Sequence, residues 1–401
     1  MNILFICDEY PPGRHGGIGT AVQQLGRGLV QAGHQVVVIG LYEYGYGQTD
    51  HFTDEGVEVI RLRKQYDFPF LSNRYRFTDK AVLKLLQKSG LAQAALREGL
   101  QRLWTAIDAL IVSHRIDIIE FTDFTDFNKH TSEILSFNRF KVPAVVKLHG
   151  SLSYLAQEYG RPVSPVLFNS ENNWIKLADA VASVSNYTGK KTSLLFNISE
   201  PFTVLYNGVQ VPEHKFLPKV NQQVIYSGSL TAGKGVYQLM KAWNIVHRKY
   251  PEATLVLCGK GDTGKARQLL DAGAVGSVTF TGHVNRQQLF EMLGKASVAV
   301  FPSYSETFGL AALEAMACGT ATIFTKKSAG PEVIVPGETG LLVNPEQETE
   351  IAEAIELLLG SASLTAKLAQ NGRQSVEAHF SITTVVQNHI AYYSTVINSR
   401  S

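Results

Sequence analysis

Residues 297–324 read SVAVFPSYSETFGLAALEAMACGTATIF, and their pattern decides the fold class. A strand of buried type ends near Phe301, a polar loop follows, and a helix is expected from about Gly309 to Cys318, where Gly319 ends it. A second apolar strand begins directly after that glycine. Strand, helix and strand in this order predict a βαβ unit of a parallel sheet.

The helix of this unit carries a carboxylate, Glu314, among Leu313, Ala315 and Met316. Because an unpaired buried charge is costly, such a run normally excludes one. Either Glu314 faces water or it holds a ligand. A carboxylate accepts hydrogen bonds from two vicinal hydroxyls, which a ribose or hexose diol offers. With Glu306 in the preceding loop and free N–H groups at the helix start, the segment suits a nucleotide sugar.

The same alternation of strands and helices extends in both directions from this unit. It predicts an α/β protein with two doubly wound, Rossmann-like domains facing a cleft. The irregular stretch 207–223 is the expected linker, which gives domains of 1–209 and 210–380 and a terminal helix over 381–401. The expected strands are 2–7, 35–40, 57–62, 116–121, 142–150, 180–185 and 202–206 in the first domain and VIYSGS, ATLVLCG, SVTFTG, SVAVFPS and TATIFT in the second, and the expected helices include 19–32, 79–114 and 170–178.

Length and composition limit the class of protein. The 401 residues fit two domains, and 45% hydrophobic with 18% charged residues describes a soluble, well-packed chain. The 37 basic and 35 acidic residues are spread evenly, so nucleic acid is not an expected partner. The opening lacks the basic, longer start of a secretory signal, and no long apolar run follows, which favours a cytoplasmic protein. The isolated Cys7, Cys258 and Cys318 support neither a disulfide framework nor a zinc site.

Three loops that follow strands carry further candidate groups. The glycines of HGGIG (15–19) precede a helix whose first turn would aim N–H groups at an anion, although a flexible turn explains them equally. His149 ends a buried strand beside Gly150, which allows close approach of a ligand; a structural histidine is the alternative. Lys234 stands just before a helix, where it is a candidate diphosphate clamp or, alternatively, a solvated loop lysine.

These motifs together resemble family 4 of the glycosyltransferases, which are retaining, nucleotide-sugar-dependent enzymes of the GT-B type. Glu306 and Glu314 match the family signature of two glutamates separated by seven residues, continued by AMACG. The resemblance covers nearly the whole chain and implies a first domain that binds the acceptor, a second domain that binds the donor, and a terminal helix that packs back on the first. Other matches in the family's order are GG at 16–17, LHG at 148–150, VSNYT at 184–188, YNGV at 206–209, GHV at 282–284 and GPEVI…GETGLLV at 330–343.

The resemblance also implies roles for single residues. Glu306 would hold a hydroxyl of the transferred sugar, Lys234 the diphosphate, and His149 would lie near the sugar; these three are the expected catalytic set. Glu314 would hold the ribose hydroxyls and Val284 would contact the base through its backbone. The other expected donor-binding residues are Gly17, Ser229, Thr307, Phe308, Gly309 and Leu310, and the expected acceptor-binding residues are Arg14 and Tyr187.

Ser229 departs from the family pattern, which usually has an arginine there, paired with the lysine. The diphosphate then loses a bidentate partner, which Ser229 or Arg14 would replace. The sequence shows no D-x-D motif or other clear metal cluster, so we expect no metal and no cofactor apart from the nucleotide diphosphate sugar as co-substrate. Lys234 and helix N-termini would then meet the leaving-group charge. The resemblance implies front-face transfer with retention, in which the departing phosphate oxygen helps take the acceptor's proton.

Residues 64–88 mix aromatic residues, arginines and lysines at four-residue spacing. They are a candidate surface for peripheral contact with the inner face of a membrane or for a lipid-phosphate acceptor; a covering loop with a solvated lysine face is the alternative. The expected function is transfer of a hexose-type sugar to a glycan, lipid-linked or small-molecule acceptor. The alternatives are a nucleotide-sugar epimerase, a phosphorolytic enzyme, or a non-catalytic sugar-nucleotide sensor on the same scaffold.

Overall fold

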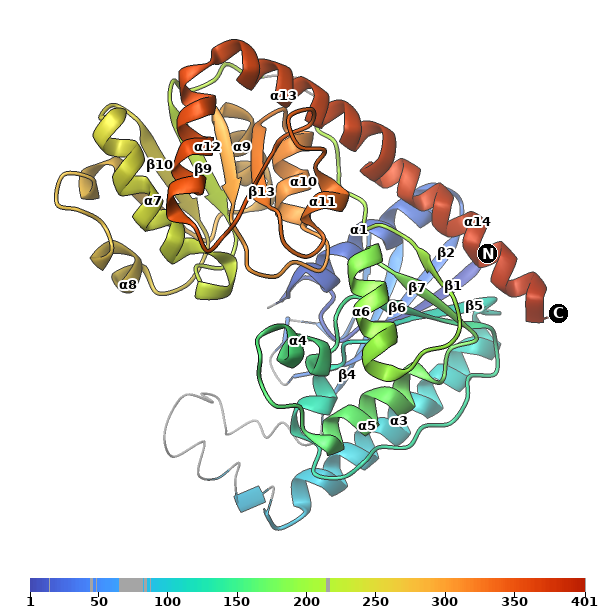
Figure 1. Ribbon diagram of the computed structural model, residues 1–401. Coiled ribbons are helices and arrows are strands. Elements are labelled where there is room, and N and C mark those ends of the chain that lie inside the picture. The colour runs from blue at the N-terminus through green and yellow to red at the C-terminus, as the bar shows by residue number, and fades with distance from the viewer. Residues whose placement is uncertain are drawn as a thin grey trace. The chain divides into compact units, whose positions relative to one another are not determined.

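The computed structural model describes residues 1–400 apart from 14, 44, 45, 48, 65–81, 83, 84, 87 and 214–216. The described chain divides into two compact units (Figure 1). Unit 1 comprises Met1–Val184, Thr188–Leu205 and Val386–Ser401, and unit 2 comprises Ser185–Tyr187 and Tyr206–Val385. The main change of unit therefore falls between Leu205 and Tyr206, next to the expected linker.

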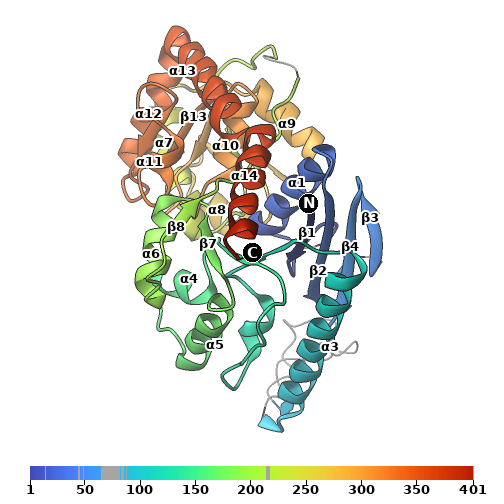
Figure 2. The same ribbon diagram turned by 90° about the vertical axis from the view of Figure 1, so that its right-hand side faces the viewer.

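Unit 1 is built on an eight-stranded sheet with the order β3-β4-β2-β1-β5-β6-β7-β8. All neighbouring strands are parallel except β3 and β4, which form the antiparallel edge visible in Figure 2. The seven strands predicted for this domain are confirmed. The strands are β1 (Asn2–Ile6), β2 (Gln35–Tyr42), β3 (His51–Asp54), β4 (Val57–Arg63), β5 (Ile118–Thr122), β6 (Ala144–Leu148), β7 (Ala180–Ser183) and β8 (Phe202–Val204).

Helices pack against this sheet and contribute residues to its hydrophobic core (Figure 1). In α3 (Leu91–Ser113) the buried residues Leu96, Leu100, Leu103 and Ile107 recur at three- and four-residue spacing and pack into the core with strand residues. The helix predicted over 79–114 is interrupted at Gly90, whose φ of 77° ends one segment and begins α3. The other helices are α1 (Gly17–Gln31), α4 (Leu152–Glu158), α5 (Pro165–Ile175) and α6 (Asn186–Phe196), with a 3-10 turn at Asp126–His130.

Unit 2 contains a six-stranded sheet in which every neighbouring pair is parallel. The strand order is β11-β10-β9-β12-β13-β14. Successive strands are added on one side of β9 up to β11 and then on its other side from β12 to β14, which is the doubly wound arrangement. The five strands predicted here are confirmed, and β14 is additional. The strands are β9 (Gln223–Ser227), β10 (Thr254–Cys258), β11 (Val278–Gly282), β12 (Val298–Phe301), β13 (Ala321–Thr325) and β14 (Leu341–Val343).

The helices of unit 2 include the one on which the fold prediction began. α10 (Leu310–Ala317) follows β12 and leads into β13, so residues 297–324 form the expected βαβ unit. α7 and α12 pack against each other, and α10 packs against α9 and α13. The remaining bounds are α7 (Val236–Lys249), α8 (Thr263–Gln268), α9 (Arg286–Lys295), α11 (Gly330–Val333), α12 (Glu348–Gly360) and α13 (Ala362–Ser375).

The last helix, α14 (Ile382–Arg400), joins unit 1 from Val386 onward. Polar side chains fix it there: Tyr393 Oη donates to Glu120 Oε2 over 2.6 Å, and Lys147 Nζ lies 2.9 Å from His389 Nε2. All four of these side chains are buried. Within the described ranges, no helix combines the length and apolar character needed to cross a membrane.

Candidate active site

Lys234 and Glu306 meet at the carboxyl edge of the unit 2 sheet. β9 and β12 are neighbours where the strand order reverses; Lys234 lies in the loop after β9 and Glu306 in the loop after β12. Lys234 Nζ donates to Glu306 Oε1 over 2.8 Å, and Ser303 Oγ donates to the same oxygen over 2.7 Å. The lysine side chain is 37% exposed. A partly exposed ammonium beside an oriented carboxylate, at the point where doubly wound sheets bind ligands, is the central feature of the candidate site.

A glycine lets the two loops approach. Gly235 has a φ of 70°, and a Cβ there would lie 1.8 Å from the carbonyl oxygen of Pro302. The Tyr304 N–H donates to the Gly233 carbonyl over 2.9 Å across the same junction. Any larger residue at position 235 would therefore push the lysine loop away from the glutamate loop.

The start of α10 is set by Phe308 and Gly309. The Phe308 ring is buried and stacks with Tyr206 at a centroid distance of 5.5 Å, and it also contacts Phe380. Gly309 has a φ of 106°, and a Cβ there would lie 2.4 Å from the Phe324 ring. The aromatic side chain thus anchors the loop while the backbone turns into the helix, so at Phe308 and Gly309 a ligand at the helix N-terminus would meet the main chain.

Glu314 has a partner that the sequence reading missed. Arg286, the first residue of α9, places Nη2 3.1 Å from Glu314 Oε1. Glu314 is 9% exposed; burial raises its pKa, and the Arg286 charge opposes that rise. The negative charge of Glu314 within the apolar helix is therefore paired with the positive charge of Arg286, which lies two residues after Val284. The signal was present in GHVNRQQ, where Asn285 caps α9 and fixes the arginine in its first turn.

Ser229 and Val284 follow two strands of the same sheet, β9 and β11, which are separated by β10. Ser229 follows β9, and its exposed side chain has no hydrogen-bond partner among the described residues. Its carbonyl accepts from Tyr226 Oη over 2.8 Å, which holds the loop in place. Val284 follows β11 and is half-buried. Thr307 is tied to the unit through its carbonyl, which accepts from Ser185 Oγ over 2.7 Å.

In unit 1, His149 follows β6 and is buried. Its Nε2 has no hydrogen-bond partner within the described part of the chain. Burial, aided by the Lys147 charge, holds the pKa of His149 well below its usual range, so the imidazole is neutral. A second residue that the sequence reading missed, Asp123, accepts from the backbone N–H groups of His149 over 2.7 Å and of Gly150 over 3.1 Å. Asp123 thereby fixes the backbone that carries the imidazole.

The N-terminus of α1 is partly occupied by the chain's own carboxylate. Glu9 Oε1 accepts from the N–H groups of Gly19 over 2.9 Å and of Gly16 over 3.3 Å. A Cβ at Gly19 would lie 2.0 Å from the Glu9 carbonyl oxygen, which explains that glycine by close packing. Gly17 is exposed at the first position of the helix. The Glu9 carboxylate thus accepts from two of the N–H groups at this turn, and the donor contact of Gly17 stays a prediction.

Of the two expected acceptor-binding residues, the structure describes only Tyr187, and the acceptor role of both stays a prediction. The backbone N–H of Tyr187 donates to Glu332 Oε1 over 2.7 Å, and both residues belong to unit 2. Arg14 lies outside the described residues. Most of the segment 64–88 does so as well; of its described residues, Lys64 is buried and ion-paired with Asp126, and Lys88 is exposed.

Comparisons with known proteins agree with this architecture. A family model described as "Glycosyltransferase Family 4" matches residues 15–212, and one described as "Glycosyl transferases group 1" matches residues 211–375. Glycogen synthase from Mycobacterium tuberculosis is 28% identical over 96% of this chain and 92% of its own length. An uncharacterized glycosyltransferase from Methanocaldococcus jannaschii is 26% identical over 98% of each chain.

Solved structures show the same fold over nearly the whole length. Sucrose-phosphate synthase from Thermosynechococcus elongatus superposes with a TM-score of 0.75 at 22% identity, covering 99% of both chains. Anabaena HepE, solved with UDP and glucose, gives a TM-score of 0.68 at 18% identity, covering 98% of this chain and all of its own. The two units together have the fold of GT-B glycosyltransferases. Within that class, the chain belongs to glycosyltransferase family 4.

Proposed function

We propose that this glycosyltransferase moves a hexose-type sugar from a nucleoside diphosphate sugar to a hydroxyl of a glycan, lipid-linked or small-molecule acceptor, with retention at the anomeric carbon. The observation that carries the proposal is the contact between Lys234 and Glu306 at the point where the unit 2 strand order reverses. Relatives support the donor class, since HepE is solved with UDP and glucose.

The two charged groups take different parts of the donor. The Lys234 ammonium binds the diphosphate and offsets the charge that develops on the leaving phosphate oxygen. The Glu306 carboxylate is held by Ser303 as well as by the lysine, so it stays oriented when a sugar hydroxyl replaces part of the lysine's contact. Because Lys234 and the α10 N-terminus supply positive potential, we propose that no divalent cation is required.

Glu314 is the proposed holder of the ribose hydroxyls, and the Arg286 charge favours its ionised form. Ser229 offers the free hydroxyl that contacts the diphosphate where the family usually has an arginine. In the transfer step, the bond from the anomeric carbon to the phosphate oxygen breaks and a bond to the acceptor oxygen forms on the same face. The acceptor's proton passes to the departing phosphate oxygen. His149 stays a predicted contact of the transferred sugar.

The decisive experiment substitutes Glu306→Gln and measures transfer from UDP-, GDP- and ADP-sugars. Removing an oriented charge at the reacting sugar should lower kcat by about 100- to 1,000-fold while the midpoint of thermal unfolding stays unchanged. Glu346→Gln is the matched control, because Glu346 makes a similar ion pair with Lys327, 2.6 Å long, at an exposed position. An unchanged kcat in Glu306→Gln would contradict the proposal.

Product analysis distinguishes the alternatives. An epimerase would convert the nucleotide sugar without an acceptor, and a sensor would bind the donor without turnover. The anomeric configuration of the product, read by NMR, tests retention, and an unchanged rate in EDTA tests independence from metal. Cytoplasmic location and membrane contact through residues 64–88 stay predictions of the sequence.

A further inference from the structure

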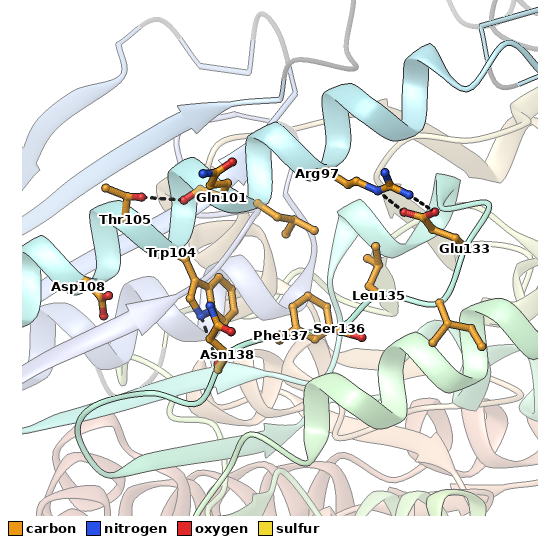
Figure 3. Close-up of a pocket in the computed structure, with 12 residues that line it drawn as sticks. Arg97, Gln101, Trp104, Thr105, Asp108, Glu133, Leu135, Ser136, Phe137 and Asn138 are labelled. Atoms are coloured by element: carbon orange, nitrogen blue, oxygen red, sulfur yellow. Dashed lines mark hydrogen bonds and ion pairs between the residues drawn. The ribbon is translucent and has the colours of Figure 1, made fainter.

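A pocket of about 540 Å³ lies in unit 1 between α3 and the segment 133–138 (Figure 3). Its volume is within the range of small-ligand sites, which is about 300–1,000 Å³. That segment leads from the 3-10 turn Asp126–His130 back toward the start of β6. Neither His149 nor Asp123 lines this pocket, and the proposed transfer reaction does not use it.

A rigid aromatic surface forms one side of the pocket. The Trp104 indole stacks with Phe137 at 5.7 Å and with Phe140 at 5.5 Å between ring centroids. Its Nε1–H donates to the Asn138 carbonyl over 3.2 Å, as Figure 3 shows. An aromatic ring that is already fixed loses little side-chain freedom when a ligand packs on it.

The charged groups of the lining are neutralised within the protein. Arg97 forms an ion pair with Glu133, with two hydrogen bonds drawn in Figure 3. Asp108 accepts from Lys141 over 2.7 Å. Because each charge already has its opposite, the lining offers no unbalanced cation to a phosphate and no unbalanced carboxylate to a metal ion or amine.

The polar groups left for a ligand are neutral. Within the described residues, the side chains of Gln101, Ser136 and Asn138 have no hydrogen-bond partner, and all three are exposed at the pocket. Amide and hydroxyl groups both donate and accept hydrogen bonds, as sugar hydroxyls do. The apolar surface of the half-buried Trp104 suits the C–H face of a pyranose ring. The hydroxyl groups of a neutral carbohydrate would thus hydrogen-bond to the neutral polar side chains, and its ring would pack on the apolar surface.

We propose that this pocket binds a short stretch of a neutral oligosaccharide, as a glycan-holding site apart from the reaction centre. The inference rests on the pocket's own chemistry and on membership of the glycosyltransferases, and it does not depend on the roles of Lys234 and Glu306. A second point of attachment raises the effective concentration of a long acceptor near the enzyme. Long neutral acceptors should accordingly show a lower KM than short ones of the same linkage.

The test uses the full chain and a panel of maltoheptaose, cellohexaose, mannohexaose and chitohexaose, with binding followed by titration calorimetry. At least one of these should bind the wild type, and the double variant Gln101→Ala/Asn138→Ala should bind it about tenfold more weakly. Both side chains are exposed and lack partners among the described residues, so the fold should be unaffected. Gln370→Ala, which removes an exposed amide from α13, is the matched control and should bind as the wild type does.

Two further measurements test the pocket independently of the double variant. Ser136→Trp should abolish binding by filling the pocket, and in the wild type the indole N–H resonance of Trp104, assigned with Trp104→Phe, should shift on titration. The proposal is overturned if no panel member binds, or if binding persists in both pocket variants. It is also overturned if UDP or inorganic phosphate shifts the Trp104 resonance and none of the glycans does.

Discussion

The ionisation of Glu314 depends on a single neighbour. Burial raises the pKa of Glu314, and Arg286 is the group that lowers it. Arg286→Ala should therefore raise the pKa further, so that Glu314 becomes protonated, and a weaker acceptor for ribose hydroxyls, at higher pH than in the wild type. The expected result is an acid limb of the kcat/KM profile that moves toward neutral pH, mainly through a higher KM for the donor. Arg286→Lys keeps the charge and should move it less; identical acid limbs for all three proteins would contradict the assignment.

Asp123 gives a pH effect on stability with a defined sign. Burial, with the nearby Glu171 charge adding to it, raises the pKa of Asp123 to about 7, although backbone N–H groups oppose the rise. Its folded-state pKa lies above the unfolded value, so the folded state binds the proton more tightly and stability falls as pH rises from about 4 to about 7. The loss of stability that comes from ionising buried Asp123 is fully present above pH 7 and is of the order of 4 kcal/mol at most.

Asp123→Asn removes that titration but also one acceptor oxygen for the N–H groups of His149 and Gly150. We expect the free energy of unfolding of the variant, measured in urea, to change less between pH 4 and pH 8 than that of the wild type. The difference between wild type and variant should shift in favour of the variant as pH rises. A difference that is constant across this range would show that Asp123 does not titrate there.

At the scale of single elements, α14 is held to unit 1 by buried polar contacts. Tyr393→Phe removes the hydroxyl that donates to buried Glu120 and should cost about 1–3 kcal/mol, because the carboxylate loses a hydrogen bond that water cannot replace. Tyr392→Phe is the matched control: its hydroxyl donates to the Val181 carbonyl over 3.1 Å from a half-buried position and should cost about 0.5–1.5 kcal/mol. Urea unfolding and amide exchange over 386–400 measure both; equal costs would contradict the role of the Glu120 contact.

Most of the strands and α10 could be predicted from short stretches of sequence, because an apolar run and the glycine that ends it lie close together in the chain. It was not enough for β3, a short half-exposed strand whose place depends on pairing with β4. The same limit applies to the site. Lys234 and Glu306 were predicted because they belong to motifs that match the family pattern. Arg286 and Asp123 also follow strands, but neither belongs to a quoted motif, and their contacts with Glu314 and with the His149 backbone appear only in the folded sheets.

For the whole molecule, each unit has its own sheet and buried core, so the two units need not unfold in one step. The expected donor-binding residues, apart from Gly17, fall in unit 2. A nucleoside diphosphate that binds only folded unit 2 stabilises that unit by mass action and leaves unit 1 unaffected unless their unfolding is coupled.

Pulsed hydrogen exchange during a thermal ramp reads the units separately, through peptides of β1 and β5 for unit 1 and of β9 and β12 for unit 2. Whichever of UDP, GDP or ADP binds should, at 100 times its Kd, stabilise unit 2 by about 2.7 kcal/mol, which corresponds to a rise in midpoint of about 5–10 °C. Lys234→Met should remove most of that rise, because the diphosphate loses its cation. A rise confined to unit 1 would contradict the placement of the donor site. An equal rise in both would show that the units unfold as one, because the stabilisation of unit 2 would then be shared by every strand of the chain.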